Sequence, residues 1–306
     1  MTARQDVGQR TDATGRVRVE HLVTSGTFSL DGGTWEVENN VWIVGDDEQC
    51  VVIDPAHAPQ QVVDAVGGRA VVAILLTHGH DDHIRAVVEV AEQLRAPVHL
   101  HPDDTMLWEQ VHPARRFDRI IRDGDVYSVG GVRLTALHTP GHSPGSVCFW
   151  APDLGEGGVL FSGDTLFQGG PGATGRSYSD FPTIVDSIRD RLLTLPGTTE
   201  VLTGHGDTTT IGAEAPPPAG VDRPRPLSRQ EAGPGDVPEH ARRPGAPTTE
   251  RRPRDPRGRR SVVRAQRRTT VRLPCRMTRP SQCHFTALDR ALHSVSRPAA
   301  TRSSGP

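Results

Sequence analysis

The apolar positions in the first half of the chain fall into short runs separated by turn residues. Four runs have the length and β-branched content of strands, and they cover residues 41–45, 50–54, 70–76 and 97–101. The run 70–76 is apolar throughout, which is typical of a strand buried on both faces. Residues 59–68 and 83–94 lie between these strands and carry apolar residues at helical spacing. This order predicts βαβ units.

The second half of the domain predicts a series of strands followed by a helix. Strand-like runs cover residues 126–130, 132–138, 146–152 and 158–163. A helix is predicted over residues 181–195 and a last strand over residues 200–204. Strands in both halves, with helices outside them, indicate a layered α/β fold.

The sequence changes character at Pro216. Residues 216–306 contain 15 of the 26 prolines and 20 Arg against 7 Asp plus Glu, whereas residues 1–215 contain 15 Arg against 30 Asp plus Glu. A segment so rich in Pro, Arg and Gly cannot bury enough apolar surface to offset its chain entropy. We therefore expect a flexible N-terminus (1–16), one globular domain (17–215) and a disordered Arg/Pro-rich tail (216–306).

Composition narrows the functional class and the compartment. The chain has no lysine, so its 35 basic residues are all Arg and Schiff-base catalysis is excluded. The opening residues lack the apolar core of a signal peptide, and no apolar run reaches the roughly 20 residues of a membrane span. The four cysteines, at positions 50, 148, 275 and 283, form no CxxC pair. We expect a cytoplasmic protein with neither a disulfide framework nor a membrane partner.

One loop concentrates side chains that bind metals. The stretch LLTHGHDDHI places His78, His80, Asp82 and His83 directly after a predicted strand. Alternating extended residues can aim His78 and His80 at one point, whereas Asp82 and His83 begin a helix and point to a neighbouring position. Imidazole and carboxylate both suit zinc, so the spacing favours two adjacent ions. The alternative is a solvated turn in which Asp81 or Asp82 caps the helix, but capping gives no reason for three histidines.

Three later segments add candidate ligands at the ends of other strands. His142 lies in HTPGHSPGS, Asp164 in SGDTLF and His205 in LTGHGD. Each of them alone could be a turn residue or a helix cap. Together they put one metal-binding side chain at each of several strand ends, which is where an α/β scaffold gathers a site.

These motifs, in this order, resemble the metallo-β-lactamase fold superfamily, and HTPGHSPGS with SGDTLF resembles its glyoxalase II-like branch of hydroxyacylglutathione hydrolases. The resemblance covers residues 17–215, which would form a metallo-hydrolase domain. It implies an α/β fold, the αββα four-layer sandwich, with the metals at one edge of two packed sheets. The implied ligands are His78, His80 and His142 for one ion and Asp82, His83 and His205 for the other, with Asp164 bridging them. His138 would lie outside this set, in a supporting role.

The resemblance also implies the chemistry. We expect a binuclear hydrolase that cleaves a thioester, the S-acyl derivative of a small cellular thiol, or a related ester by means of a metal-bridging hydroxide. Asp82 would orient the hydroxide and accept its proton. Two divalent ions are expected, zinc first, with iron or manganese as alternatives. The tail does not predict the helical domain that holds glutathione in long glyoxalase II enzymes, so another thiol such as mycothiol is an alternative.

The loop after Asp164, residues 167–183, is expected to overhang the site. In this loop Arg176 could clamp a substrate carboxylate, and Tyr178 could stack or donate a hydrogen bond. A flexible surface turn with a solvated Arg is the alternative.

Three further interpretations stay open. A mononuclear iron persulfide dioxygenase of the same fold would use His78, His142 and Asp164. An RNA-processing nuclease would bind phosphates through the tail, but the acidic body would repel them, so no nucleic-acid partner is expected. The tail itself is either an accessory arm or a frameshift product, since out-of-frame reading of G/C-rich DNA gives such a composition.

Overall fold

A computed structural model describes residues 10–216 of the 306-residue chain. The predicted disordered tail lies, except for Pro216, outside the described residues, as do residues 1–9 of the predicted flexible N-terminus. In the remainder of that N-terminus, Arg10 is buried and its guanidinium donates two hydrogen bonds to the Glu200 carboxylate. Within the described residues, no helix has the length and apolar character needed to cross a bilayer.

The first half of the domain forms a six-stranded sheet in the order β1-β2-β3-β4-β5-β6. The strands are β1 (Arg18–Leu30), β2 (Gly33–Gly45), β3 (Gln49–Ile53), β4 (Ala70–Leu75), β5 (Val98–Leu100) and β6 (Arg119–Ile120). β1, β2 and β3 pair antiparallel, whereas β3 to β6 are parallel. The connections between the parallel strands contain α1 (Pro59–Val66), α2 (Asp81–Ile84), α3 (Val87–Leu94), the 3₁₀ turn η1 (Pro102–Asp104) and α4 (Thr105–Val111). The βαβ units predicted from the sequence are present.

The second half forms another six-stranded sheet, in the order β14-β13-β10-β9-β8-β7. Its strands are β7 (Val126–Val129), β8 (Val132–His138), β9 (Val147–Ala151), β10 (Val159–Gly163), β13 (Glu200–Thr203) and β14 (Thr209–Thr210). Only β10 and β13 are parallel neighbours. The connection between them contains the short hairpin β11 (Leu166–Phe167) and β12 (Gly170–Pro171), then α5 (Phe181–Ser187) and the π-helical turn η2 (Ile188–Leu192). α6 (Ile211–Glu214) follows β14.

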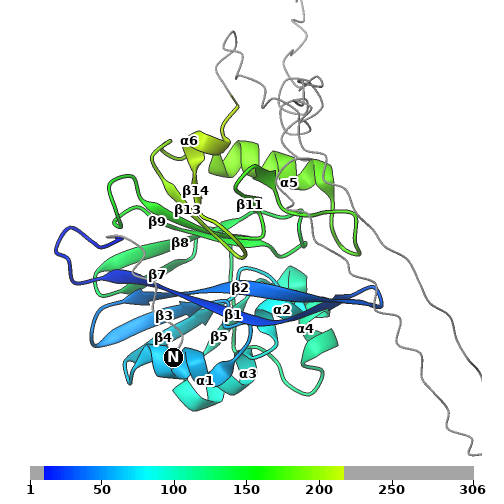
Figure 1. Cartoon of the computed structure of the whole chain (residues 1–306), viewed down its shortest axis with the longest axis horizontal. Helices are drawn as coiled ribbons and strands as arrows, with labels where there is room; N and C mark the ends of the chain where they lie inside the picture. Colours follow the sequence, from blue (N-terminus) through cyan, green and yellow to red (C-terminus); the bar gives the residue numbers. More distant parts are fainter. Residues whose placement is uncertain (1–9, 217–306) are drawn as a thin grey trace, which may run out of the picture. The chain divides into compact units, whose positions relative to one another are not determined.

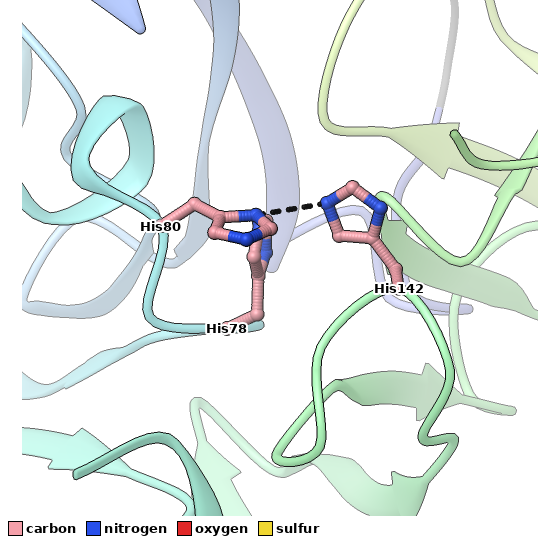
Figure 2. A group of neighbouring side chains, drawn as sticks. All are labelled: His78, His80 and His142. Atoms are coloured by element: carbon pink, nitrogen blue, oxygen red, sulfur yellow. Dashed lines mark hydrogen bonds between the residues drawn. The ribbon is translucent and has the colours of Figure 1, made fainter. Parts of the chain in front are cut away.

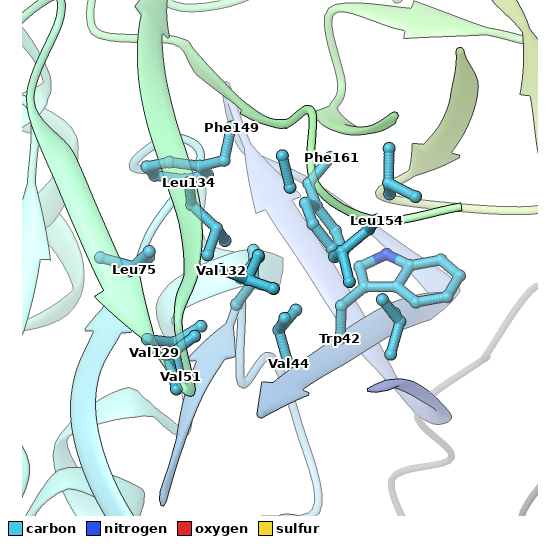
Figure 3. Packing of buried hydrophobic residues seen from close by; sticks show 14 of the residues in the cluster. Trp42, Val44, Val51, Leu75, Val129, Val132, Leu134, Phe149, Leu154 and Phe161 are labelled. Atoms are coloured by element: carbon cyan, nitrogen blue, oxygen red, sulfur yellow. The ribbon is translucent and has the colours of Figure 1, made fainter. Parts of the chain in front are cut away.

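The two sheets pack face to face through alternating apolar side chains. On β2, Trp42 and Val44 point into this interface. From the second sheet, Leu134 and Phe149 meet them, and Figure 3 shows the side chains of both sheets filling the space between the ribbons. This layer is the central core of the domain.

The opposite faces of both sheets are also apolar and are covered by helices. Val41 and Ile43, which alternate with the inward-facing residues of β2, join a second core that includes residues of α1 and α3. Leu160 of β10 joins a third core with Ile184 of α5. Three apolar layers separate four layers of secondary structure, with α1 and α3 on one side and α5 on the other (Figure 1). The predicted αββα sandwich is confirmed.

Several elements differ from the sequence prediction. The first two strands are 13 residues each, whereas only residues 41–45 were predicted as a strand. The predicted helix 83–94 is two helices, because α2 ends at Ile84 and α3 begins at Val87. The predicted helix 181–195 is α5 followed by η2. α4 and the closing pair β14 and α6 were not predicted.

Candidate metal centre

Seven candidate side chains gather where strands of both sheets end. His78 and His80 follow β4, and Asp82 and His83 lie in α2. The second sheet supplies the other three from the segments that follow β8, β10 and β13, namely His142, Asp164 and His205. His78, His80, Asp82, His83 and His142 are all buried. The structure therefore brings together side chains that are up to 127 positions apart, from His78 to His205.

The first ligand set consists of three imidazoles around one point. The rings of His78, His80 and His142 lie 4.7–4.8 Å apart in pairs and are nearly perpendicular to one another. His80 Nδ1 and His142 Nε2 face each other at 3.0 Å (Figure 2). Each residue offers a nitrogen within 4.8 Å of the other two nitrogens. This arrangement suits one cation.

The second set lies beside the first and contains a carboxylate. Its ligand atoms are Asp82 Oδ2, His83 Nε2 and His205 Nε2, which are separated by 3.2–3.8 Å. Asp164 lies between the two sets. Its Oδ2 is 3.5 Å from both His142 Nε2 and His205 Nε2, and its Oδ1 is 3.5 Å from His83 Nε2. Asp164 is therefore placed to contact ions in both sets.

Hydrogen bonds on the outer side of the rings fix which nitrogen faces inward. The Nδ1–H of His142 donates to Ala173 O at 2.8 Å, and that of His205 donates to Glu38 O at 2.6 Å. His83 Nδ1 bonds Asp54 Oδ2 at 3.0 Å. Because these outer nitrogens carry the proton in the neutral ring, each Nε2 presents a lone pair to the centre.

The inward atoms fit a pair of divalent cations. His78 Nε2 and Asp164 Oδ1 are buried and have no hydrogen-bond partner. Lone pairs of His83 and His205 that face each other at 3.2 Å repel unless a positive charge lies between them. Ligand atoms at tetrahedral corners about 2.0–2.2 Å from one cation are separated by about 3.3–3.6 Å, which is close to the distances in the second set. Nitrogen and carboxylate oxygen ligands suit zinc, iron or manganese.

The pKa values show that the two sets differ in charge. Burial and the neighbouring His142 lower the pKa of His80 to about 3, and burial also lowers the pKa of His78, so both of these rings are neutral. In the second set, burial acts to lower the pKa of His83, but the Asp82 and Asp164 carboxylates raise it to about 9. Although burial disfavours a charged carboxyl, His83 and His205 lower the pKa of Asp82 to about 2. The two carboxylates therefore stabilise positive charge at this set, which a proton supplies in the metal-free protein and a metal ion would supply in its place.

Two buried carboxylates that were not identified from the sequence hold the ligand loops. Asp54, at the end of β3, accepts hydrogen bonds from Thr77 N and Thr77 Oγ1 as well as contacting His83. Asp104 accepts from Gly79 N at 2.7 Å, from Ser143 Oγ at 2.7 Å and from Gly145 N at 2.6 Å. It therefore ties the loop that carries His78 and His80 to the turn that carries His142. For Asp54, the signal in the sequence is a carboxylate directly after an apolar strand.

The other predicted residues lie around this centre. The guanidinium of Arg176 stacks over Trp35 at 4.0 Å, at the β1–β2 hairpin. In the same hairpin, Phe28 lies 5.5 Å from His80. Tyr178 is 49% exposed and has a left-handed backbone, with φ of 70°. The Nε2–H of His138 donates to Pro144 O, so His138 shapes the turn that contains His142.

Comparisons with known proteins identify the family. A family model described as the metallo-beta-lactamase superfamily matches residues 34–205. The chain is 36% identical over 192 residues to YqgX of Bacillus subtilis, a probable metallo-hydrolase, covering 58% of this chain and 90% of that protein. It is 32% identical over 193 residues to the hydroxyacylglutathione hydrolase GloC of Haemophilus influenzae, with coverages of 58% and 90%. The solved structure of TTHA1623 in a di-iron-bound form is 35% identical, with a TM-score of 0.52, over 62% of this chain and 96% of that one. The resemblance drawn from the motifs is confirmed, and the chain belongs to the metallo-β-lactamase superfamily.

Proposed function

We propose that this protein is a binuclear metal-dependent hydrolase that cleaves a thioester, or a related ester, of a small thiol. The observation that carries the proposal is the pair of adjacent ligand sets joined by Asp164. Its carboxylate lies 3.5 Å from His142 in the first set and 3.5 Å from His205 in the second. A relative named a hydroxyacylglutathione hydrolase, 32% identical, supports the thioester class.

The chain's own residues have distinct parts in this reaction. His78, His80 and His142 would hold one divalent ion, and Asp82, His83 and His205 the other, with Asp164 shared. When bound, such an ion pair lowers the pKa of water and polarises a carbonyl group. Asp82 stays ionised at neutral pH because its pKa is about 2. Its carboxylate can therefore accept a hydrogen bond from the attacking water and orient it. We propose that Asp82 also receives the proton of this water, whose pKa the bound ions would lower.

The β1–β2 hairpin and the loop after β12 supply a wall for the substrate. Phe28 and Trp35 form its apolar part, with ring centroids 5.7 Å apart. Arg176 lies over Trp35 and adds a positive charge. Asp31 at the hairpin tip accepts hydrogen bonds from Ser177 N at 3.1 Å and Ser177 Oγ at 2.6 Å, which joins the two segments. An acyl thioester with a carboxylate in its thiol part matches this combination.

A persulfide dioxygenase of the same fold would use a single iron held by His78, His142 and Asp164. The H-x-H-x-D-H motif occurs in both groups, so the number of bound ions, rather than the ligand residues, distinguishes the two functions.

The test combines metal analysis with a panel of thioesters. The purified full chain is expected to bind about two zinc, iron or manganese ions and to hydrolyse S-lactoylglutathione or an S-acyl mycothiol. Chelation should abolish turnover, and added zinc should restore it. An Asp82→Asn variant should retain the first ion and lose most of kcat. Binding of one iron only, with oxygen uptake in the presence of a persulfide, would overturn the proposal.

A further inference from the structure

Asn39 lies against the second ligand set. It is in β2 and is fully buried, with 0% of its surface exposed. Its side-chain Nδ2 is 3.3 Å from Asp82 Oδ2, 3.4 Å from His83 Nε2 and 3.4 Å from His205 Nε2. One terminal atom of this amide therefore faces all three ligand atoms of the set at once.

These four atoms form a nearly regular tetrahedron. The six distances among them lie between 3.2 and 3.8 Å. Four ligand atoms about 2.0–2.2 Å from a shared cation are expected to be about 3.3–3.6 Å apart. The terminal atom of Asn39 thus occupies a fourth corner around Asp82, His83 and His205, in addition to the position of the shared Asp164.

The two ends of the amide differ in what they offer a cation. In the orientation described, Nδ2 points to the three ligand atoms, and Oδ1 is buried without a hydrogen-bond partner. Oxygen and nitrogen of an Asn amide are interchanged by a 180° rotation, and the choice follows from the surrounding hydrogen bonds. A divalent cation repels N–H groups and attracts the carbonyl oxygen. The rotated amide therefore places Oδ1 at this fourth corner.

The neighbouring Asn40 does not face the ligand atoms. Asn40 Nδ2 donates to Thr203 O at 3.1 Å and to Gly206 O at 3.0 Å, and its Oδ1 lies 2.8 Å from His21 Nε2. All of its polar atoms have protein partners outside the ligand set. Asn40 holds the chain before and after Gly204, whereas Asn39 faces the ligand atoms.

We propose that Asn39 contributes its side-chain oxygen as an additional ligand to the divalent cation held by Asp82, His83 and His205. The amide adds a neutral oxygen to this set and raises its coordination number by one. The inference concerns metal binding, so it stands or falls independently of the thioester substrate.

The experiment is a Co²⁺ titration of the metal-free full chain, followed by visible absorption. Asn39→Leu keeps the number and branching of the side-chain heavy atoms but removes the oxygen. We expect it to weaken binding of the second Co²⁺ by at least about tenfold and to change the d–d spectrum, while binding of the first Co²⁺ is unchanged. Gln60→Leu, an amide loss on the exposed face of α1, is the control and should match the wild type.

Asn39→Asp distinguishes between two roles of the Asn39 side chain, a metal ligand and a hydrogen-bond donor. If the side chain supplies an oxygen, the carboxylate keeps it, and binding of the second Co²⁺ stays equal or tightens. If the side chain acts only as an N–H donor, the new carboxylate adds a ligand that the wild type lacks, so the d–d spectrum of Asn39→Asp departs from that of the wild type whereas Asn39→Leu keeps it. This second outcome overturns the proposal, as does an Asn39→Leu protein with unchanged affinity and spectrum. Circular dichroism checks the fold of each variant, and Asn39→Asp, which is nearly isosteric, decides the question if Asn39→Leu does not fold.

Discussion

Asp104 provides a direct test of how the ligand loops are held. Its side chain is fully buried between the loop after β4 and the turn after β8. Replacement by Leu would leave Gly79 N and Gly145 N without acceptors, whereas Ser143 Oγ keeps Ser146 Oγ at 2.9 Å. Each buried orphaned donor costs about 1–3 kcal/mol, so the two together predict a loss of about 2–6 kcal/mol.

Asp104→Asn should be milder. The amide oxygen can replace one carboxylate oxygen, but its NH₂ group faces a donor, which predicts a loss of about 1–3 kcal/mol. Burial raises the pKa of Asp104, so the wild type also bears a cost of burying a charge. The neutral amide avoids that cost, which keeps the loss toward the lower end.

The assay is urea unfolding of the metal-free protein, together with metal occupancy. Asp103→Asn is the matched control, because the Asp103 side chain is 58% exposed and should change stability by less than about 0.5 kcal/mol. We also expect Asp104→Leu to lose the ion of the first set before that of the second, since Asp104 joins the loops that carry His80 and His142. A fully stable Asp104→Leu protein that retains both ions would refute this account.

Three other perturbations test the surroundings of the site. Burial lowers the pKa of His57 to about 4, so the folded state binds this proton less readily than the unfolded state. The free energy of unfolding should therefore fall by about 3 kcal/mol as the pH drops from 6.5 toward 4. His57→Phe should remove this part of the pH dependence in unfolding measurements. Arg176→Gln should raise KM about tenfold, or about 1.4 kcal/mol, for thioesters whose thiol part carries a carboxylate; an equal effect on neutral thioesters would contradict the clamp. A Cβ on Gly141, which has φ of 133°, would lie 2.3 Å from Ile184 N. Gly141→Ala should therefore push α5 from the His142 turn and lower the free energy of unfolding by at least about 1 kcal/mol, whereas an unchanged free energy of unfolding would show that the turn can rearrange without cost.

The parts of the fold that sequence could predict are those in which local pattern and burial agree. Residues 50–53 of β3 and 73–75 of β4 are buried on both faces because these parts of the strands lie between two cores. The prediction that the whole run 70–76 is buried was wrong for its start, where Ala70 and Val72 are exposed. The candidate metal ligands could also be predicted, because a strand end fixes where each loop begins. Neither conclusion needed knowledge of which strands are neighbours.

The length of the β1–β2 hairpin could not be predicted from the local pattern of apolar residues. In the outer half of the hairpin, exposed and half-buried positions are mixed. There the two strands pair with each other and are not packed against an apolar core. For this reason Phe28 and Trp35 were not predicted to lie near His80, although they form the wall on that side of the site. The contact depends on how far the hairpin extends, which the alternation of residues does not specify.

The roles of two buried polar residues were also not predicted from the sequence. Asn39 and Asp104 act through contacts with residues far away in the sequence, such as His205 for Asn39 and Gly145 for Asp104. A pair of asparagines in the middle of a strand is nevertheless a usable signal. An amide buried in a sheet needs partners that the ladder does not supply, so such a pair indicates a polar site on one face of the strand.

The position of the ligands explains why the metal centre and the sandwich depend on each other. His78, His80, Asp82 and His83 belong to the first sheet and its connections, whereas His142, Asp164 and His205 follow strands of the second. Each ligand set contains side chains from both sheets, so a bound ion links one sheet to the other. In the proposed binuclear centre Asp164 is shared, so binding of one ion would fix a ligand of the other. The two binding steps would then be coupled through a single carboxylate, and both would be coupled to the packing of the central core.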